Sequence, residues 1–158
     1  MFRKMRRFAQ QTTTEEAINI LLNEKRGVLS LIGDEGYPYG VPMNYYYDKE
    51  SGNIYFHGAK EGHKIDSIKK NNKACFTVYT QGEKREGEWF YRPQSVICFG
   101  HINFINDIEL TKKLLWPLGD KYFPSKEYTK AEIEESLNHV QVLELVIDHM
   151  TGKSVKEK

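Results

Sequence analysis

The alternation of hydrophobic and polar positions predicts a set of short strands joined by turns. Five runs are rich in β-branched and aromatic residues: GVLSLI (27–32), IYFH (54–57), KACFTVY (73–79), SVICFGHINFI (95–105) and VQVLELVIDHM (140–150). The first run is followed by GDEG (33–36), whose residues accept positive φ, and this predicts a hairpin. With the segment that returns from the hairpin, we expect five or six strands.

The returning segment, YPYGVPMNYYYD (37–48), contains two prolines. Pro38 and Pro42 each remove a backbone donor. The segment is therefore predicted to be an edge strand, a bent strand, or a strand whose backbone faces something other than a neighbouring strand. The pattern agrees with all three alternatives.

Helical periodicity occurs in four segments. Thr13 precedes Glu16 by three residues, the spacing of a capping box, and a hydrophobic face follows, which predicts a helix from about Thr14 to Lys25. Three further helical segments are predicted at 64–72, 106–123 and 125–140.

The last two helical segments carry their own start and stop signals. Asn106 or Asp107 is expected to cap the first of them, and Thr129 the second. Pro117 and Gly119 are expected to break the helix in 106–123.

Strands and helices do not alternate along the chain, which disfavours a doubly wound sheet. The order of elements fits an α+β domain built on an antiparallel barrel. We expect residues 1–158 to form a single domain, with a polar, mobile tail from about residue 151.

Composition and charge narrow the classes of function. A formal net charge of +1 gives no global attraction to nucleic acid or to an anionic membrane, and no segment has the length and apolarity of a signal peptide or a membrane span. We expect a cytoplasmic protein. Cys75 and Cys98 lie in strand-like runs without metal or redox spacing, so buried free thiols are expected.

The stretch YFHGAKEGHK (55–64) is a candidate anion site. Gly58 and Gly62 let backbone amides approach an anion, a helix that begins near His63 directs its positive end outward, and Lys64 adds a full charge. A phosphate monoester would fit. The alternative is a glycine-containing turn whose lysines point into water.

Two other interpretations of this stretch have less support. A nucleoside-triphosphate P-loop fails on spacing, because only three residues separate the two glycines and Ile65 stands where a hydroxyl is needed. His57 and His63 lack further ligands at typical spacing, so no metal site is expected.

These segments, in this order, resemble the pyridoxamine 5'-phosphate oxidase-like superfamily of FMN-binding split barrels, and within it the nitroimidazole-resistance (Nim) family. The resemblance is carried by GVLSLIGDEGYPYGVPMNYYYD, IYFHGAKEGHKIDSIKKN, KACFTVY, SVICFGHINFI, LLWPLGDKYFP and VIDHMTGK. It implies an antiparallel split β-barrel with flanking helices, and FMN as the cofactor.

The resemblance also implies which residues hold the cofactor. An Arg-Lys pair binds the FMN phosphate in the oxidases, and the matching residues here are His63 and Lys64, so this role rests mainly on Lys64. His57 and Gly58 stand where the oxidases have Tyr-Thr, and HGA at this point is typical of the Nim-like branch. This places His57 near the flavin.

Further contacts follow from the strand that lines the flavin ring in the oxidases. That strand matches residues 42–47, which implies cofactor contacts for Pro42, Met43, Asn44 and Tyr45. Ser95 stands where the oxidases have a flavin-contacting glutamine, and it is a further cofactor-binding candidate.

A homodimer with FMN at the subunit interface is also implied. Trp89, Tyr91 and Trp116 are candidates for closing over the ring from the partner chain, and packing within their own chain is the alternative.

The resemblance suggests an oxidoreductase that passes electrons from a nicotinamide donor to a small acceptor such as a nitroimidazole. His57 is the candidate catalytic residue, because an imidazole can donate a proton near neutral pH, and a purely structural hydrogen bond is the alternative. The second hypothesis is a non-catalytic flavin, haem or flavin-nucleotide binding protein. Pyridoxamine phosphate oxidase activity is disfavoured, since the ending IDHMTGKSVKEK lacks the arginine and histidine pattern expected of it.

Overall fold

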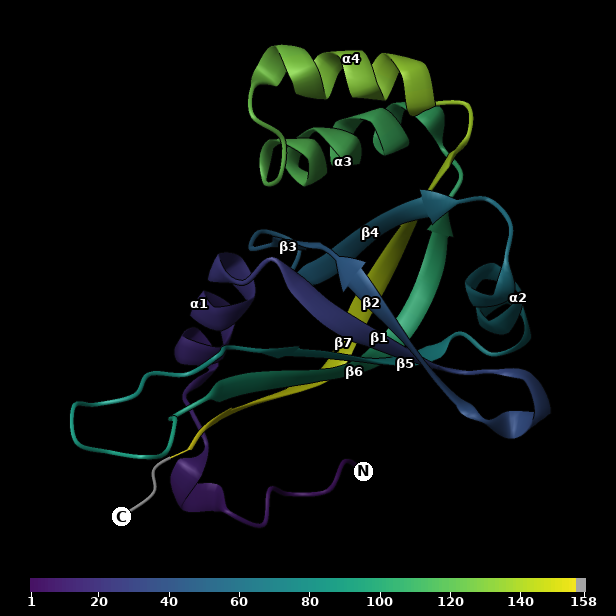
Figure 1. Cartoon of the computed structure of the whole chain (residues 1–158). Helices are drawn as coiled ribbons and strands as arrows, with labels where there is room; N and C mark the ends of the chain where they lie inside the picture. The colour runs from purple at the N-terminus through teal and green to yellow at the C-terminus, as the bar shows by residue number, and fades with distance from the viewer. Residues whose placement is uncertain (156–158) are drawn as a thin grey trace.

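A computed structural model describes residues 1–155, and one seven-stranded antiparallel sheet curls through its centre (Figure 1). The strands are β1 (Arg26–Ile32), β2 (Pro38–Asn44), β3 (Tyr46–Asp48), β4 (Asn53–Ala59), β5 (Lys73–Tyr79), β6 (Gln94–Ile105) and β7 (Val140–Ser154). Their order across the sheet is β2-β1-β5-β6-β7-β4-β3.

Helices cover the two ends of this sheet. They are α1 (Thr14–Asn23), α2 (His63–Lys70), α3 (Ile108–Asp120) and α4 (Lys126–Ser136), with short 3-10 helices at Phe8–Gln10 and Asp34–Gly36. Figure 1 shows α3 and α4 stacked as a pair over β4 at one end of the molecule, whereas α2 lies beside the strands. The predicted α+β antiparallel split barrel is confirmed.

The barrel curls because β2 and β3 lie at opposite edges of the sheet although only Tyr45 separates them in the chain. Tyr45 is fully buried, and its hydroxyl donates to the Leu21 carbonyl at 2.7 Å. Its backbone N–H donates to Tyr122 Oη at 2.8 Å, and its carbonyl accepts from Lys121 Nζ at 3.1 Å. The backbone of this corner therefore pairs with side chains instead of a neighbouring strand.

This arrangement decides between the three alternatives for residues 37–48. Pro38–Asn44 forms an edge strand, and within residues 1–155 its only partner strand is β1, from Pro38 opposite Ile32 to Asn44 opposite Arg26. The third alternative, a backbone that faces something other than a strand, holds at Tyr45 alone.

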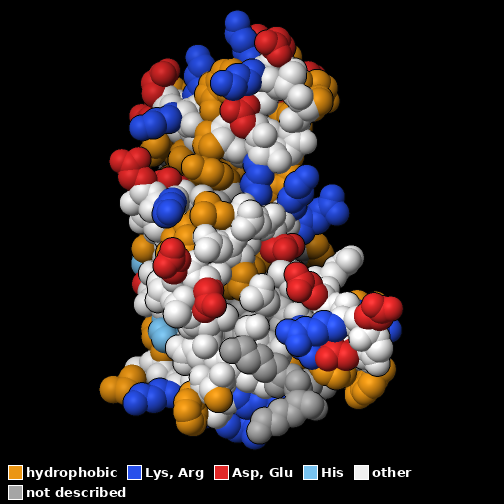
Figure 2. Space-filling model, turned by 90° about the vertical axis from the view of Figure 1, so that its left-hand side faces the viewer, with side chains coloured by type: hydrophobic (Ala, Val, Ile, Leu, Met, Phe, Trp, Pro, Cys, Tyr) orange, Lys and Arg blue, Asp and Glu red, His pale blue; other side chains and the backbone are white. Residues whose placement is uncertain are grey.

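Two hydrophobic clusters hold the fold together. The larger fills the inside of the curled sheet and takes in the buried faces of α1 and α2. The smaller lies between β4, β7 and the α3–α4 pair, around Tyr55, Leu118 and Val142. Figure 2 shows charged side chains of both signs scattered over one face of the molecule, in keeping with the small net charge.

Two expectations about the later helices are wrong. Helix α3 continues through Pro117 and Gly119 to Asp120, because Leu118 packs into the smaller cluster and Gly119 lies against Thr129. A Cβ at Gly119 would come within 2.5 Å of Thr129 Cγ2. Helix α4 is capped by Ser125, and Thr129 is a buried residue within the helix.

Other elements differ from the prediction in their length. The capping box of Thr13 and Glu16 is present, but α1 ends at Asn23. Of the two residues expected to cap α3, Asp107 is the N-cap. The mobile tail expected from residue 151 is wrong for its first part, since β7 runs to Ser154 and its last residue pairs with Gln94. The end of the predicted tail, 156–158, lies outside the described residues.

Candidate functional site

The centre of the candidate site is the Lys64 ammonium group. Helix α2 starts directly after Gly62, whose φ of 120° suits glycine, and Lys64 lies in its first turn. Lys64 Nζ lies 3.6 Å from Met43 Sδ. A Cβ built on Gly58 would lie 2.9 Å from Nζ, so the missing side chain of Gly58 provides the space that the ammonium occupies.

Lys64 also spans the split in the barrel. Met43 belongs to the edge strand β2, and Gly58 belongs to β4. β4 pairs with β3 only through Asn53–Tyr55, so its last residues have β7 on one side and no strand on the other. The ammonium group therefore lies between the two halves of the curled sheet.

This cation has no anionic partner within the part of the chain that the structure describes. None of the ion pairs there involves Lys64, and the Met43 sulfur is only a weak acceptor. Burial lowers the pKa of the Lys64 ammonium, which is half-buried. The first turn of α2 also has no side-chain cap, so its N–H groups are free to bind an anion.

His57 neighbours Gly58 on β4 but points to the other face of the sheet, because successive side chains on a strand alternate. Crowding by surrounding protein lowers the pKa of the imidazole, and the positive charge of Lys64 adds to this. The His57 side chain is nevertheless exposed, so solvent screens part of the effect. The Lys64 charge thus reaches His57 across β4 and disfavours protonation of its imidazole.

His63 turns away from this centre. Its ring stacks on Tyr39, with 4.0 Å between ring centroids, and its Nε2 lies 3.6 Å from Asp34 Oδ2. Lys70 donates to the same carboxylate at 3.0 Å and, with His63, lowers the pKa of Asp34. The imidazole is thereby held against the hairpin between β1 and β2.

The residues predicted along the flavin-lining strand point in different directions. Met43 is buried and faces Lys64, whereas Pro42 and Asn44 are exposed on the opposite face, where Asn44 accepts from Arg26 Nε at 3.3 Å. The Tyr45 side chain lies in the core with its hydroxyl bonded. Of these four residues, Met43 is the one that contacts Lys64.

The sequence matches the family model described as pyridoxamine 5'-phosphate oxidase over residues 13–154. The chain belongs to this family. A comparison with curated proteins gives no significant match.

Solved structures agree with the oxidase-family assignment. A protein described as a candidate 5-nitroimidazole antibiotic resistance protein from Bacteroides thetaiotaomicron VPI-5482 is 27% identical, with a TM-score of 0.75 over 90% of this chain and 84% of that one. The predicted resemblance to the oxidase-like superfamily and to its Nim branch is confirmed.

More distant solved structures share the fold. A FAD-binding protein from Mesorhizobium loti is 19% identical, with a TM-score of 0.68 over 93% of this chain and 96% of that one. A FAD and heme binding protein from Mycobacterium smegmatis is 20% identical, with a TM-score of 0.74 over 94% and 74%. At these identities the likeness supports the architecture alone.

Within this oxidase-family fold, Ser95 is not brought to the Lys64 centre of the same chain. Ser95 lies near the start of β6, where it pairs with Tyr79 and Lys153. His57 pairs with Val142 of β7, and Val142 in turn pairs with Ile105, the last residue of β6. Ten residues of strand separate the two positions, or roughly 33 Å if the strand were straight.

Of the three aromatic candidates, two are exposed and one packs within its own chain. Trp89 and Tyr91 are 82% and 56% exposed on the loop between β5 and β6. Trp116 packs against the smaller hydrophobic cluster of its own chain. Of the two free cysteines, Cys98 is buried as predicted, but Cys75 is only partly buried.

Sequence reasoning missed Tyr39 and Asp34, which hold His63, and the sulfur of Met43 as the contact of Lys64. No local motif marks these pairs, since they join β2 or its hairpin to α2 across about 20 to 30 residues. Within residues 1–155, no group of three His, Cys, Asp or Glu side chains could hold a metal ion. Helices in that range are also too short or too polar to span a membrane.

Proposed function

We propose that this protein binds FMN, with the phosphate on Lys64 and the amides of the first turn of α2. The observation that carries the proposal is the half-buried Lys64 ammonium, which has no carboxylate partner among residues 1–155 and lies over Gly58. A phosphate would supply the missing negative charge, and a charge-assisted bond of this kind is among the stronger polar contacts. Two structural relatives are named as FAD-binding proteins, which supports a flavin as the ligand.

The protein residues have distinct roles in this proposal. Lys64 neutralises the phosphate, Gly58 keeps the space open, and Met43 offers an apolar contact beside the ammonium. The chemistry that FMN supplies when bound is hydride and electron transfer, here from a nicotinamide donor to a small acceptor. A nitroimidazole is the proposed acceptor, supported by the relative from Bacteroides thetaiotaomicron.

His57 is the proposed hydrogen-bond donor to the acceptor. Its lowered pKa makes the neutral imidazole the main form at pH 7, and a neutral imidazole still carries one N–H that can donate a hydrogen bond. Exposure of the side chain leaves it accessible to a small molecule.

The proposal includes a homodimer. The outward face of the sheet carries two rows without charged side chains, as the strand registers show: Pro42, Val28, Thr77, Ile97 and Thr151 in one row, and Gly40, Ser30, Cys75, Phe99 and His149 in the other. Ile97 and Phe99 are 37% and 39% exposed. An uncharged face of this kind suits a second copy of the chain.

Flavin titration tests the phosphate contact. Lys64→Ala is expected to weaken FMN binding about 10- to 100-fold, because it removes a charge-assisted contact of about 1.5 to 3 kcal/mol. The matched control is Lys60→Ala, which removes an exposed lysine of the same loop. Quenching of FMN fluorescence gives both dissociation constants, and equal affinity in the Lys64→Ala and wild-type proteins would contradict the proposed site.

A turnover assay tests the catalytic half of the proposal. With FMN bound, NADH or NADPH oxidation should depend on a nitroimidazole, and His57→Ala should lower kcat about 100-fold or more while FMN is retained. The competing function is a non-catalytic flavin or haem binding protein, favoured by one observation: His63, at the position of the oxidase arginine, is held by Tyr39 and Asp34. FMN binding without oxidation of either donor would select that function.

A further inference from the structure

The sheet has a notch where β6 extends beyond its neighbour β5. β5 pairs with β6 only as far as Lys73 opposite His101. The next residue, Ile102, still finds a partner, because its N–H donates to the Asn72 carbonyl at 2.8 Å and its carbonyl accepts from Asn72 Nδ2 at 3.4 Å.

Beyond that point the strand edge has no partner. Backbone groups of alternate residues in a strand point to the same side, so the N–H and C=O of Phe104 face the same side as those of Ile102. Among residues 1–155 no hydrogen bond reaches the Phe104 backbone from that side. One adjacent donor and acceptor are left open to a ligand.

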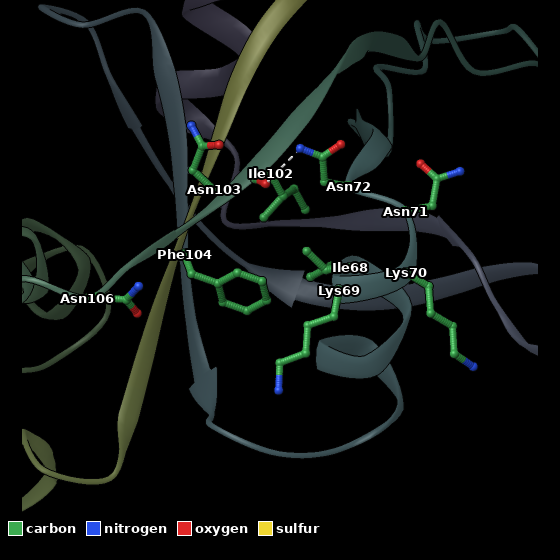
Figure 3. Close-up of a pocket in the computed structure, with 9 residues that line it drawn as sticks. All are labelled: Ile68, Lys69, Lys70, Asn71, Asn72, Ile102, Asn103, Phe104 and Asn106. Carbon is green, nitrogen blue, oxygen red and sulfur yellow. Dashed lines mark hydrogen bonds between the residues drawn. The ribbon is translucent and has the colours of Figure 1, made fainter.

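A cavity of about 690 Å³ lies at this notch, between the end of α2 and the end of β6. Figure 3 shows its lining, with Ile68 and the Phe104 ring facing each other in the middle: Ile68, Lys69, Lys70, Asn71, Asn72, Ile102, Asn103, Phe104 and Asn106. The cavity is wide open to solvent, and its volume is sufficient for a small molecule.

The two lysines of the cavity are not equivalent. Lys70 is paired with Asp34 at 3.0 Å, and in Figure 3 it points away from the Phe104 ring. Lys69 extends on the same side as that ring, and no described carboxylate lies within ion-pair distance of it. Lys69 is therefore the cation available to a ligand.

The amide side chains add polar groups around the same space. Asn103 donates to Glu144, and Asn71 accepts from the backbone of Lys73, so both are partly used within the chain. Asn106 makes no hydrogen bond within the described part of the chain. Its amide offers both a donor and an acceptor at the end of β6.

We propose that this cavity binds a nucleotide. The edge of the base would present a donor beside an acceptor, which would pair with the C=O and the N–H of Phe104. A phosphate of the nucleotide would bind Lys69. A peptide strand is the less suitable occupant, because one unpaired residue offers it only two backbone bonds. The inference does not rest on the proposed flavin site, which lies at the opposite end of α2.

Calorimetric titration of the FMN-treated, full-length protein with ADP and with UDP tests this site. Binding of at least one nucleotide is expected. The matching nucleoside, which lacks the phosphates, and ribose 5-phosphate, which lacks the base, should each bind at least about 10-fold more weakly. Lys69→Ala should weaken nucleotide binding about 10-fold, and Asn106→Ala by a smaller factor. Lys49→Ala, on the turn between β3 and β4, is the matched control.

Lys64→Ala separates this site from the flavin site. Nucleotide affinity unchanged in Lys64→Ala but reduced in Lys69→Ala supports the cavity, whatever the outcome of the FMN titration. Binding that is lost in Lys64→Ala and kept in Lys69→Ala would place the nucleotide at the other end of α2 and overturn the inference. Absence of binding of ADP and UDP at millimolar concentration would also overturn it.

Discussion

At the scale of single residues, the site depends on the absence of a side chain at Gly58. Lys64 Nζ occupies the volume that a side chain at position 58 would fill, and the ammonium reaches this position from the first turn of α2. Lys64 is half-buried with no counter-charge in the described part of the chain, and an anion would offset the resulting desolvation cost.

Gly58→Ala is therefore expected to weaken FMN binding while the fold stays intact. The new methyl group would displace Lys64 Nζ, and because a lysine end is flexible, the ammonium moves instead of the strand. We expect FMN affinity about 3- to 10-fold lower and a change in the free energy of unfolding below about 1 kcal/mol. Fluorescence titration and urea denaturation measure the two quantities, and a large loss of stability with unchanged affinity would contradict this account.

At the scale of elements, the corner between β2 and β3 is held by the end of α3. Lys121 Nζ donates to the Glu24 carbonyl at 2.7 Å and to the Tyr45 carbonyl at 3.1 Å, and it lies 3.9 Å from the centre of the Tyr45 ring. Tyr122 Oη donates to the Tyr45 carbonyl at 2.6 Å. These contacts tie the α1–β1 junction and the barrel corner to α3.

The titration of Lys121 gives this corner a pH dependence. Burial lowers the pKa of Lys121 to about 8, below the usual lysine value, so between pH 8 and about 10 the unfolded chain binds more protons than the folded one. The contribution of Lys121 to the free energy of unfolding therefore rises with pH in this window, by at most about 1.4 kcal/mol per pH unit.

Lys121→Met isolates this contribution, because other groups titrate in the same range. Burial raises the pKa of the Cys98 thiol to about 12, which makes stability fall with pH above about 8.5. We therefore expect the stability of the wild type relative to Lys121→Met to increase from pH 7 to pH 9.5, measured by urea denaturation. A difference that stays constant with pH would mean that Lys121 keeps its ordinary pKa.

At the scale of the whole molecule, the curled sheet separates two surfaces. Its inner side is filled by the larger hydrophobic cluster, and its outer side presents the two uncharged rows that cross β2, β1, β5, β6 and β7. Phe2 of the N-terminal segment stacks on His149 and Phe99 and covers part of the second row.

Ile97→Arg is expected to convert the proposed homodimer to a monomer, because it places a charge within the uncharged first row, at its most exposed large hydrophobic side chain. Size-exclusion chromatography with light scattering gives the mass directly. Ile108→Arg is the matched control, since Ile108 is also exposed but begins α3 away from this face. A wild-type protein of 18.5 kDa in solution would contradict the dimer, and so would an Ile97→Arg variant that stays dimeric.

The sequence by itself determined the strands β1, β4, β5, β6 and β7, the first helix with its capping box, and the glycine-containing turn before Lys64. It did not separate β3 from β2, so the sheet has seven strands where five or six were expected. These features depend on neighbours within a few residues, such as the alternation in 73–79 and the spacing of Thr13 and Glu16. Local signals were misleading where packing outweighed them. Pro117 and Gly119 lie inside α3 because Leu118 and Thr129 fix that turn against the sheet and α4.

Only the tertiary structure decided which residues meet. It placed Lys64 between Met43 and Gly58, turned His63 to Tyr39, and separated Ser95 from His57 by most of the length of β6. The notch at Phe104 likewise exists because β6 is longer than its neighbour. The physical reason is that contacts across a curled sheet are set by strand register and by the path of the chain at Tyr45, which no short stretch of sequence specifies.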